Sequence, residues 1–343
     1  RAMLCLALTC RPAGTDRLIL AARNVHRSFV YAAALLDLPV RWLWPQAGGS
    51  LCSCPVTGEE LDQALSSLPR PPAAVYVTSP DYLGLMQPIE ELAQVCHRHG
   101  TLLLVDNAHG AYLHFLPKPC HPMDLGADLC CDSAHKTLPV LTGGAYLHIS
   151  RQAPPAMASR AKQAMAMFGS TSPSYLTLAS LDLCNGYLAG SYRERLHQAQ
   201  DQLQAFRLRL QGLGWHGLLR QHQVECECSS RDEVVLMVTP ENHPWDLERV
   251  IQALGKAPDG PALPAPPVLP GASCIQAMTP REALFSPQEN IPTFQALGRI
   301  CGAPTVACPP AIPVAISGER FGQEALAVLA HYDVEAVDVV ANP

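Results

Sequence analysis

The stretch Leu102-Leu103-Leu104-Val105-Asp106-Asn107-Ala108-His109-Gly110 decides the fold of this chain. Four consecutive aliphatic residues predict a strand that is apolar on both faces, as in a parallel sheet covered by helices on each side. Asp106 follows at once, so the sequence predicts a carboxylate at the carboxyl end of a buried strand. Ligands of open α/β sheets bind at that end of the strands.

A second segment, Ser133-Ala134-His135-Lys136-Thr137, contains one of only four lysines in the 343-residue chain. A strand ending in a carboxylate, with a serine-flanked His-Lys downstream, suits pyridoxal phosphate (PLP). Lys136 would form a Schiff base with the cofactor aldehyde. Asp106 would pair with the pyridinium nitrogen and keep the ring an electron sink. The competing interpretations are an ordinary exposed lysine and a surface or helix-capping aspartate.

Short apolar runs alternate with helical patterns in the first half of the chain. This alternation predicts an α/β fold with a mostly parallel sheet flanked by helices. Polar candidates follow several of the predicted strands, so they should gather at one edge of the sheet. These candidates are His26, Ser79, Asp106 and residues 133–136. Strands are predicted over residues 17–22, 73–78, 102–105, 128–132 and 145–149, and helices over 28–36 and 88–99.

The second half predicts a separate, smaller unit. A long amphipathic helix over 192–211 could carry the chain from one unit to the next, and residues 255–271 form a proline-rich linker. We therefore predict a PLP-binding major domain over residues 1–215 and a small α+β domain over 216–343. Within the second half we expect strands at 234–238 and 334–340 and helices at 245–254 and 322–331.

Composition excludes several function classes. The net charge of −6, without a basic cluster, argues against nucleic acid or an anionic membrane as partner. The fourteen cysteines include no CxxC pair, so neither a zinc site nor a disulfide scaffold is indicated, and we expect buried thiols in a reduced cytoplasm. No stretch approaches the roughly 20 apolar residues of a membrane span.

Several motifs together resemble the PLP-dependent ornithine/lysine/arginine decarboxylases, whose fold is of the aspartate-aminotransferase type. The matching segments are Arg23-Asn24-Val25-His26-Arg27-Ser28, Val105 to Ala111, Gly126 to Pro139, Met278 to Ala283, and Pro309 to Pro313. The resemblance covers nearly the whole chain. It implies a first phosphate-binding loop just before Arg1.

The resemblance also implies roles for individual residues, in a site without a metal ion. Lys136 would carry the cofactor, Asp106 would bind its pyridine nitrogen, and His135 or Lys136 would donate the final proton. The remaining residues would contact the cofactor: His26 stacked on the ring, Ala108 against its other face, Ser133 and His135 at the phosphate, and His109 at the phosphate or substrate.

The implied reaction is decarboxylation of lysine, ornithine or arginine to the corresponding amine, a polyamine precursor, by a cytoplasmic homodimer or higher homo-oligomer. Acidic candidates for the distal cation of the substrate are Asp81, Glu282 and Glu319. The sequence departs from the family pattern at Asp81 (usually Thr), Asn107 (Glu), Tyr112 (His), Ala311 (Gly) and Ser317 (Pro). An aminotransferase-like enzyme of the same fold and a non-catalytic relative remain the alternatives.

Overall fold

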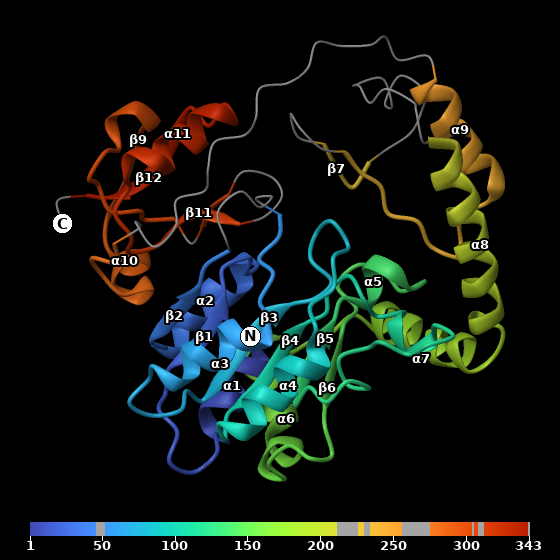
Figure 1. The fold of residues 1–343 in the computed structure, drawn as a ribbon, viewed down its shortest axis with the longest axis horizontal. Helices are drawn as coiled ribbons and strands as arrows, with labels where there is room; N and C mark the ends of the chain where they lie inside the picture. The colour runs from blue at the N-terminus through green and yellow to red at the C-terminus, as the bar shows by residue number, and fades with distance from the viewer. Residues whose placement is uncertain are drawn as a thin grey trace.

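A six-stranded sheet lies at the centre of the molecule (Figure 1). This computed structural model describes residues 1–45, 52–210, 226–229, 234–255, 275–303, 305–307 and 312–341. The pairs of neighbouring strands are parallel, except that β6 runs antiparallel to β5. The predicted class, α/β with a mostly parallel sheet, is confirmed. From edge to edge the strands are β2 (Val40–Leu43), β1 (Ile19–Ala22), β3 (Ala74–Thr78), β4 (Leu102–Asp106), β5 (Leu129–Asp132) and β6 (Tyr146–Ile149).

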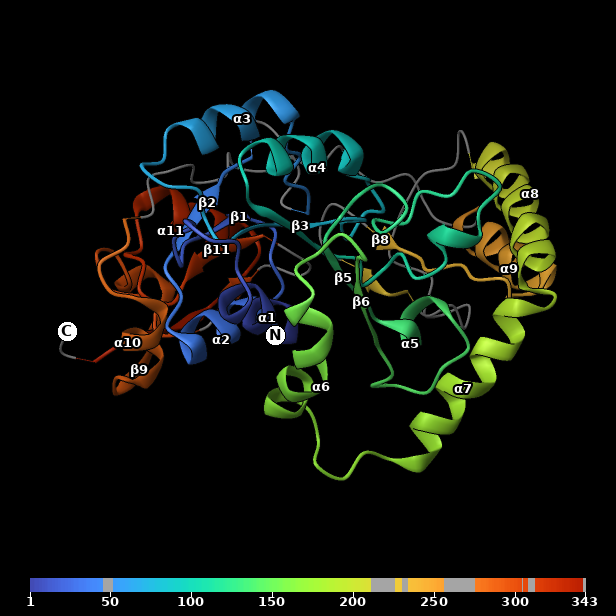
Figure 2. The ribbon, with the colours of Figure 1, turned by 90° about the horizontal axis from the view of Figure 1, so that it is seen from below.

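Helices cover both faces of this sheet, as the uninterrupted apolar strands require (Figure 2). Successive residues of β3 point to opposite faces, so Ala74 and Tyr76 join one buried cluster while Val75 and Val77 join the other. One face is covered by α1 (Ala2–Thr9), α2 (Arg27–Leu36) and α6 (Ala156–Phe168), and the other by α3 (Gly58–Ser66) and α4 (Ile89–Arg98).

Local signals explain where these helices begin and end. Thr57 and Glu60 form a capping box at the start of α3, which satisfies backbone N–H groups of the first turn. Pro88 precedes α4, and Gly100, with φ of +67°, turns the chain after its end. The predicted helix over 88–99 is thus confirmed to within a residue, whereas β2 and α3 were not predicted.

The chain then leaves the sheet through α7 (Tyr175–Ala189) and α8 (Tyr192–Leu210). Phe206 of α8 packs with Val250 and Leu254 of α9 (Pro244–Leu254) in a small separate cluster. The predicted helices over 192–211 and 245–254 are confirmed, but the strand predicted at 234–238 is only β8 (Val234–Val235), paired with β7 (Cys228–Ser229). The predicted 215/216 boundary and almost all of the 255–271 linker lie outside the described residues.

The C-terminal part combines two antiparallel strand pairs with helices. β9 (Gln288–Pro292) pairs with β12 (Ala336–Val340), and β10 (Thr305–Ala307) pairs with β11 (Pro313–Ile316). Helices α10 (Pro280–Phe285) and α11 (Gln323–His331) complete it, so the predicted helix at 322–331 and strand at 334–340 are both found.

A buried ion pair fixes this C-terminal part to the sheet. The two terminal nitrogens of Arg23, just after β1, each lie 2.7 Å from an oxygen of Glu319, and both side chains are buried. The Arg23 guanidinium also lies 4.3 Å over the ring of Trp44. Removing one partner of such a pair leaves an uncompensated buried charge. The segment that leads from β1 to His26 is therefore held from the C-terminal side.

Two further observations bear on the composition-based predictions. Within the described part of the chain, no helix is long and apolar enough to cross a membrane. The cysteines whose side chains are described are free thiols, and most of them are buried. Buried free thiols behave as small hydrophobic residues, as predicted.

Candidate active site

The predicted polar residues lie at one edge of the sheet. His26 follows β1, Ser79 follows β3, Asp106 ends β4, and Ser133–Lys136 follow β5. Because β1, β3, β4 and β5 are parallel neighbours, their carboxyl ends meet at this edge. Ser79 is fully buried and its Oγ accepts the backbone N–H of Gln87 at 3.0 Å, which makes it a structural residue here.

Lys136 lies on the short helix α5 (Ala134–Thr137) and points at a histidine. Its Nζ is 2.9 Å from Nε2 of His109, so Nε2 accepts a hydrogen bond from the lysine ammonium and the ring proton sits on Nδ1. Burial, reinforced by the charge of Lys136, lowers the pKa of His109 to about 4. His109 is therefore neutral near pH 7 and orients the lysine without competing with it for a proton.

Asp106 is buried, and both of its oxygens are engaged. Oδ2 accepts the hydroxyl of Tyr76 at 2.9 Å, and Oδ1 accepts the backbone N–H of Ala108 at 3.2 Å. A carboxylate offers about four lone-pair positions, so Asp106 retains the capacity to accept one more donor. A pyridinium N–H is a donor of that kind.

Tyr76 is a site residue that the sequence does not reveal. Its hydroxyl lies within a buried strand, where burial and the neighbouring Asp106 raise its pKa well above the usual range. It therefore stays neutral and donates to the carboxylate. A tyrosine in an otherwise aliphatic strand is the one available signal, but its partner depends on the pairing of β3 with β4.

His26 stands at the start of α2 and is open to solvent. Its Nδ1 accepts the backbone N–H of Ser28 at 3.2 Å, so one of its contacts is that of a helix-capping residue. Desolvation, together with the charge of Lys136, lowers its pKa against the opposing effect of Asp106. His26 thus lies close enough to sense both Lys136 and Asp106, and its stacking role stays a prediction.

The predicted phosphate contacts have less structural support. His135 donates through Nδ1 to the carbonyl oxygen of Gly144 at 2.9 Å, which leaves Nε2 as the acceptor side of a half-buried ring. Ser133 and Ala108 are also half-buried at the sheet edge. The contacts assigned to these three residues stay predictions.

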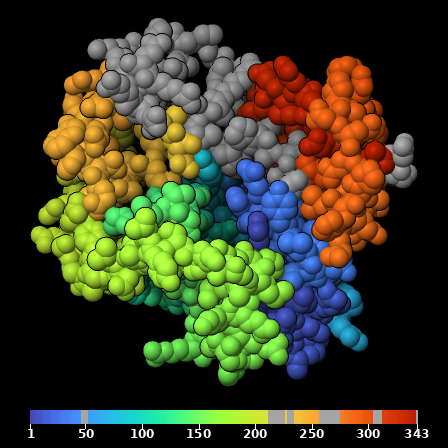
Figure 3. Space-filling model, turned by 180° about the vertical axis from the view of Figure 1, so that it is seen from behind, coloured from blue at the N-terminus to red at the C-terminus, as the bar shows by residue number. Residues whose placement is uncertain are grey.

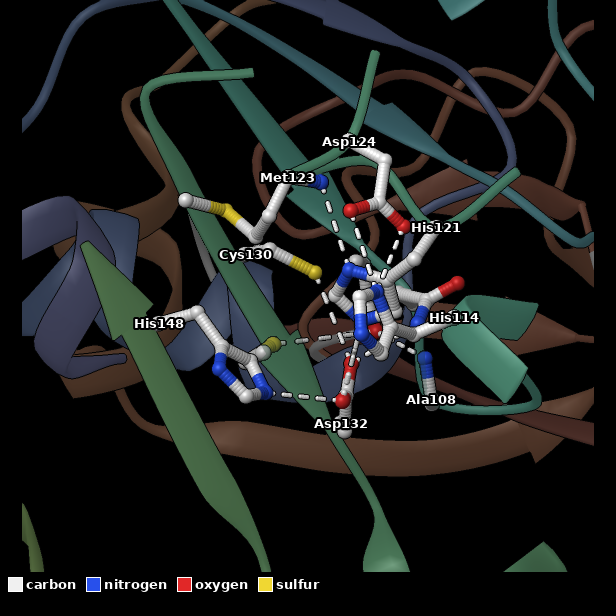
Figure 4. A network of polar contacts seen from close by, with 11 residues as sticks. Ala108, His114, His121, Met123, Asp124, Cys130, Asp132 and His148 are labelled. Atoms are coloured by element: carbon white, nitrogen blue, oxygen red, sulfur yellow. Dashed lines mark hydrogen bonds and ion pairs between the residues drawn. The ribbon is translucent and has the colours of Figure 1, made fainter. Parts of the chain in front are cut away.

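A second carboxylate, Asp132 at the end of β5, collects a network of polar contacts (Figure 4). Its oxygens lie 3.1 Å from Nε2 of His121 and 2.8 Å from Nε2 of His148, and Asn107 donates through Nδ2 at 2.7 Å. Burial alone would raise the pKa of Asp132, but the hydrogen bonds from both histidines outweigh burial and lower it. Asn107 directly follows Asp106 in the chain, so it links this network to the Asp106 loop.

In the described part of the chain, His121, Cys130 and Asp132 form the one group whose side chains lie close enough to hold a metal ion. Their hydrogen bonds favour another interpretation. Met123 donates its backbone N–H to Nδ1 of His121 at 3.2 Å, so the ring proton sits on Nε2 and faces Asp132 instead of leaving that nitrogen free for a metal. Burial also raises the pKa of Cys130 well above its usual range, which keeps it a thiol.

A pocket of about 640 Å³ is lined by His109, the hydrogen-bond partner of Lys136, and by Thr137, which follows Lys136 in the chain. The loops that follow β3 and β4 form one side of the pocket, and α8, Glu227 and residues 234–238 form the other. The polar side chains on its walls are Asp81, Tyr82, His109, Tyr112, Thr137, Arg207 and Glu227.

The structure separates the three acids considered for a substrate cation. Glu319 is buried against Arg23, and Glu282 caps α10 through Thr279, outside the pocket. Asp81 lies on the pocket wall.

Comparisons with known proteins agree with this geometry. The family described as Orn/Lys/Arg decarboxylase, major domain, matches residues 3–226. The chain is 27% identical to an arginine decarboxylase of Halalkalibacterium halodurans, over 92% of this chain and 73% of that protein.

Solved structures share the fold. The lysine decarboxylase of Francisella novicida superposes with a TM-score of 0.72 at 14% identity, covering 99% of this chain and 68% of that one. A PLP-bound serine palmitoyltransferase from S. paucimobilis covers 74% of this chain and 69% of its own at a TM-score of 0.55 and 15% identity. The family match extends over most of the chain, including the Asp106 and Lys136 segments. The chain therefore belongs to the Orn/Lys/Arg decarboxylase family of amino-acid decarboxylases.

Proposed function

We propose that this chain is a PLP-dependent decarboxylase that converts lysine, ornithine or arginine into the corresponding amine. The observation that carries the proposal is the convergence of Lys136, His109 and Asp106 at one sheet edge, in a chain whose residues 3–226 match the family's major domain. The relatives' names include arginine and lysine decarboxylases, which supports a cationic substrate.

The donor set fits the cofactor. Lys136 supplies the amine that holds it covalently, and Asp106, oriented by Tyr76 and the Ala108 N–H, supplies the acceptor for its ring nitrogen. When bound, PLP supplies the electron sink that stabilises the carbanion left by loss of CO₂. In this proposal His26 flanks the ring, and Ser133 and His135 contact the phosphate.

The reaction also needs a residue of the protein that donates a proton to the product carbon. Lys136 contacts a neutral imidazole, so its ammonium has a fixed hydrogen-bond partner from which it can turn toward the reacting carbon. His135 donates its Nδ1–H to the carbonyl oxygen of Gly144, so that proton is held in a hydrogen bond to the backbone. Of the two donors considered, the structure supports Lys136 better.

We also propose a cytoplasmic homodimer, with a domain division near residues 215/216. On the face shown in Figure 3, α6 and α7 (light green) spread across the surface. Here α7 exposes Tyr175, Leu176 and Leu183 at 87%, 73% and 75% of their areas. Large apolar side chains gathered on one exposed helix are typical of a protein–protein interface.

Turnover measurements test the proposed function. Purified chain with added PLP should release CO₂ and the matching amine from at least one of lysine, ornithine and arginine, and Lys136→Ala should release none. Formation of a keto acid would indicate an aminotransferase instead. Absence of any product with all three amino acids would favour the non-catalytic alternative.

A further inference from the structure

Of the three acids considered for the substrate cation, Asp81 is the one that lines the pocket. It follows β3 in the loop at the catalytic edge, and it is only 1% exposed. Its Oδ1 accepts two backbone N–H groups, from Leu83 at 3.0 Å and from Leu85 at 2.9 Å. These bonds fix the carboxylate and shape the turn around Gly84, whose φ is +83°.

The second oxygen of Asp81 has no such role. Oδ2 is buried and has no hydrogen-bond partner within the described part of the chain. A buried carboxylate oxygen without a donor is costly, because burial removes the water that would otherwise solvate its charge. Such a position is stabilised when a cation binds to it.

A second unpaired polar atom lies on the same pocket. Thr137 follows Lys136 directly, is 7% exposed, and its Oγ1 finds no partner among the described residues. Asp81 and Thr137 both line the pocket that also contains His109, the partner of Lys136. The walls of this pocket therefore hold two acceptor atoms without a donor among the described residues, a carboxylate oxygen and a hydroxyl oxygen.

We propose that Asp81, assisted by Thr137, binds the distal ammonium or guanidinium of the substrate and so selects basic amino acids. This inference rests on the proposed function, because the same pocket must hold the substrate. Because Asp81 is only 1% exposed, a cation must displace the side chains that cover Oδ2, while the two backbone hydrogen bonds to Oδ1 hold the carboxylate in place. The wall also carries Glu227, whose Oε1 accepts the Tyr82 hydroxyl at 3.4 Å, but Glu227 is exposed, so water solvates its charge and it needs a bound cation less than Asp81 does.

Equilibrium binding separates this inference from the proposed reaction. Calorimetric titration of the chain without added PLP compares L-lysine with L-norleucine, which has the same shape but lacks the distal cation. We expect L-lysine to bind at least about tenfold more tightly, as one charge-assisted hydrogen bond provides. In Asp81→Asn, which keeps Oδ1 as an acceptor, this difference should vanish while norleucine binding stays unchanged.

Two further variants complete the test. Glu282→Gln is the matched control, because it removes an equivalent carboxylate outside the pocket, and it should keep the full preference for lysine. Thr137→Val should lower lysine affinity by about three- to tenfold, and it provides a second measurement if Asp81→Asn does not fold.

The outcomes are distinguishable. Equal binding of lysine and norleucine by the unaltered chain, or an unchanged lysine preference in Asp81→Asn, overturns the role of Asp81 even if decarboxylation occurs. If the preference for lysine depends on Asp81 but no amino acid is decarboxylated, the cation site is supported and the proposed reaction is wrong.

Discussion

Two aspartates end neighbouring strands of the same sheet, yet their surroundings differ. Asp106 at the end of β4 receives one hydroxyl and one backbone N–H, lies 3.9 Å from the thiol of Cys131 and interacts electrostatically with His109, the partner of Lys136. Asp132 at the end of β5 receives two imidazoles and an amide and lies 3.5 Å from the thiol of Cys130. Asp132 is saturated by the protein itself, whereas Asp106 retains capacity for a ligand.

The difference shows that a buried carboxylate at a strand end is not enough to mark a catalytic residue. What matters is whether the fold supplies all of its partners. Asp132 ties β5 to β6 through His148 and to the Asp106 loop through Asn107. It is a positioning residue for the site, and substitutions at the two aspartates should affect different properties.

The largest expected effect is on stability, at Asp132. Asp132→Asn turns an acceptor-only group into one whose amide hydrogens face the N–H groups of His121 and His148. We expect the free energy of unfolding to fall by about 3–5 kcal/mol, the usual cost of removing one partner of a buried charged pair. Urea unfolding measures this loss, and a change below about 1 kcal/mol would contradict the structural role.

Asp106→Asn should show the opposite pattern. Stability should change by about 1 kcal/mol, because the amide oxygen can still accept the Ala108 N–H while the Tyr76 hydroxyl can rotate and accept from the amide nitrogen. Decarboxylation should fall by about 10²–10³-fold, as when one preorganised electrostatic group is removed. Steady-state kinetics with added PLP test this, and comparable turnover in the variant would remove Asp106 from the catalytic centre.

The two sites should also respond to different ranges of pH. The pKa of His109 is lowered from 6.5 to about 4 in the folded protein, so the unfolded chain binds its proton first. Stability should therefore fall as pH drops from about 6.5 to 4, by up to about 3 kcal/mol from this group. The pKa of Asp132 is lowered from its ordinary value of 3.8. The stability that Asp132 contributes is therefore present above pH 3.8 and is lost only as the pH falls below that value.

Thermal unfolding across pH 4–7 measures this slope. His109→Gln should flatten it, while the exposed control His197→Gln should leave it unchanged. An equal slope in all three proteins would show that His109 is not held neutral.

The smallest expected effect is at Tyr76. Tyr76→Phe keeps the ring packed against Phe29, with centroids 4.6 Å apart, and removes only the hydroxyl bonded to Asp106. We expect a loss of about 1 kcal/mol in stability and up to about tenfold in turnover. Unchanged turnover would mean that Tyr76 does not tune the carboxylate.

Local patterns explain which features the sequence predicts. The aliphatic run before Asp106 and the alternation of strands with helices predict the sheet and the position of Asp106 and Lys136 after neighbouring strands at its carboxyl edge. Tyr76 and Asp132 escape prediction because their roles depend on pairing between β3 and β4 and between β5 and β6. Glu319 looks available in the sequence, but its pairing with Arg23 joins residues 296 positions apart.

Lys136 alone should hold the cofactor. Incubation with PLP, reduction with borohydride and peptide mass spectrometry would locate a pyridoxyl group, with Lys118, Lys162 and Lys256 as internal controls. We expect one modified lysine, Lys136, and a visible absorption band that is absent from Lys136→Ala. A pyridoxyl group on another lysine, or a band that persists in Lys136→Ala, would contradict it.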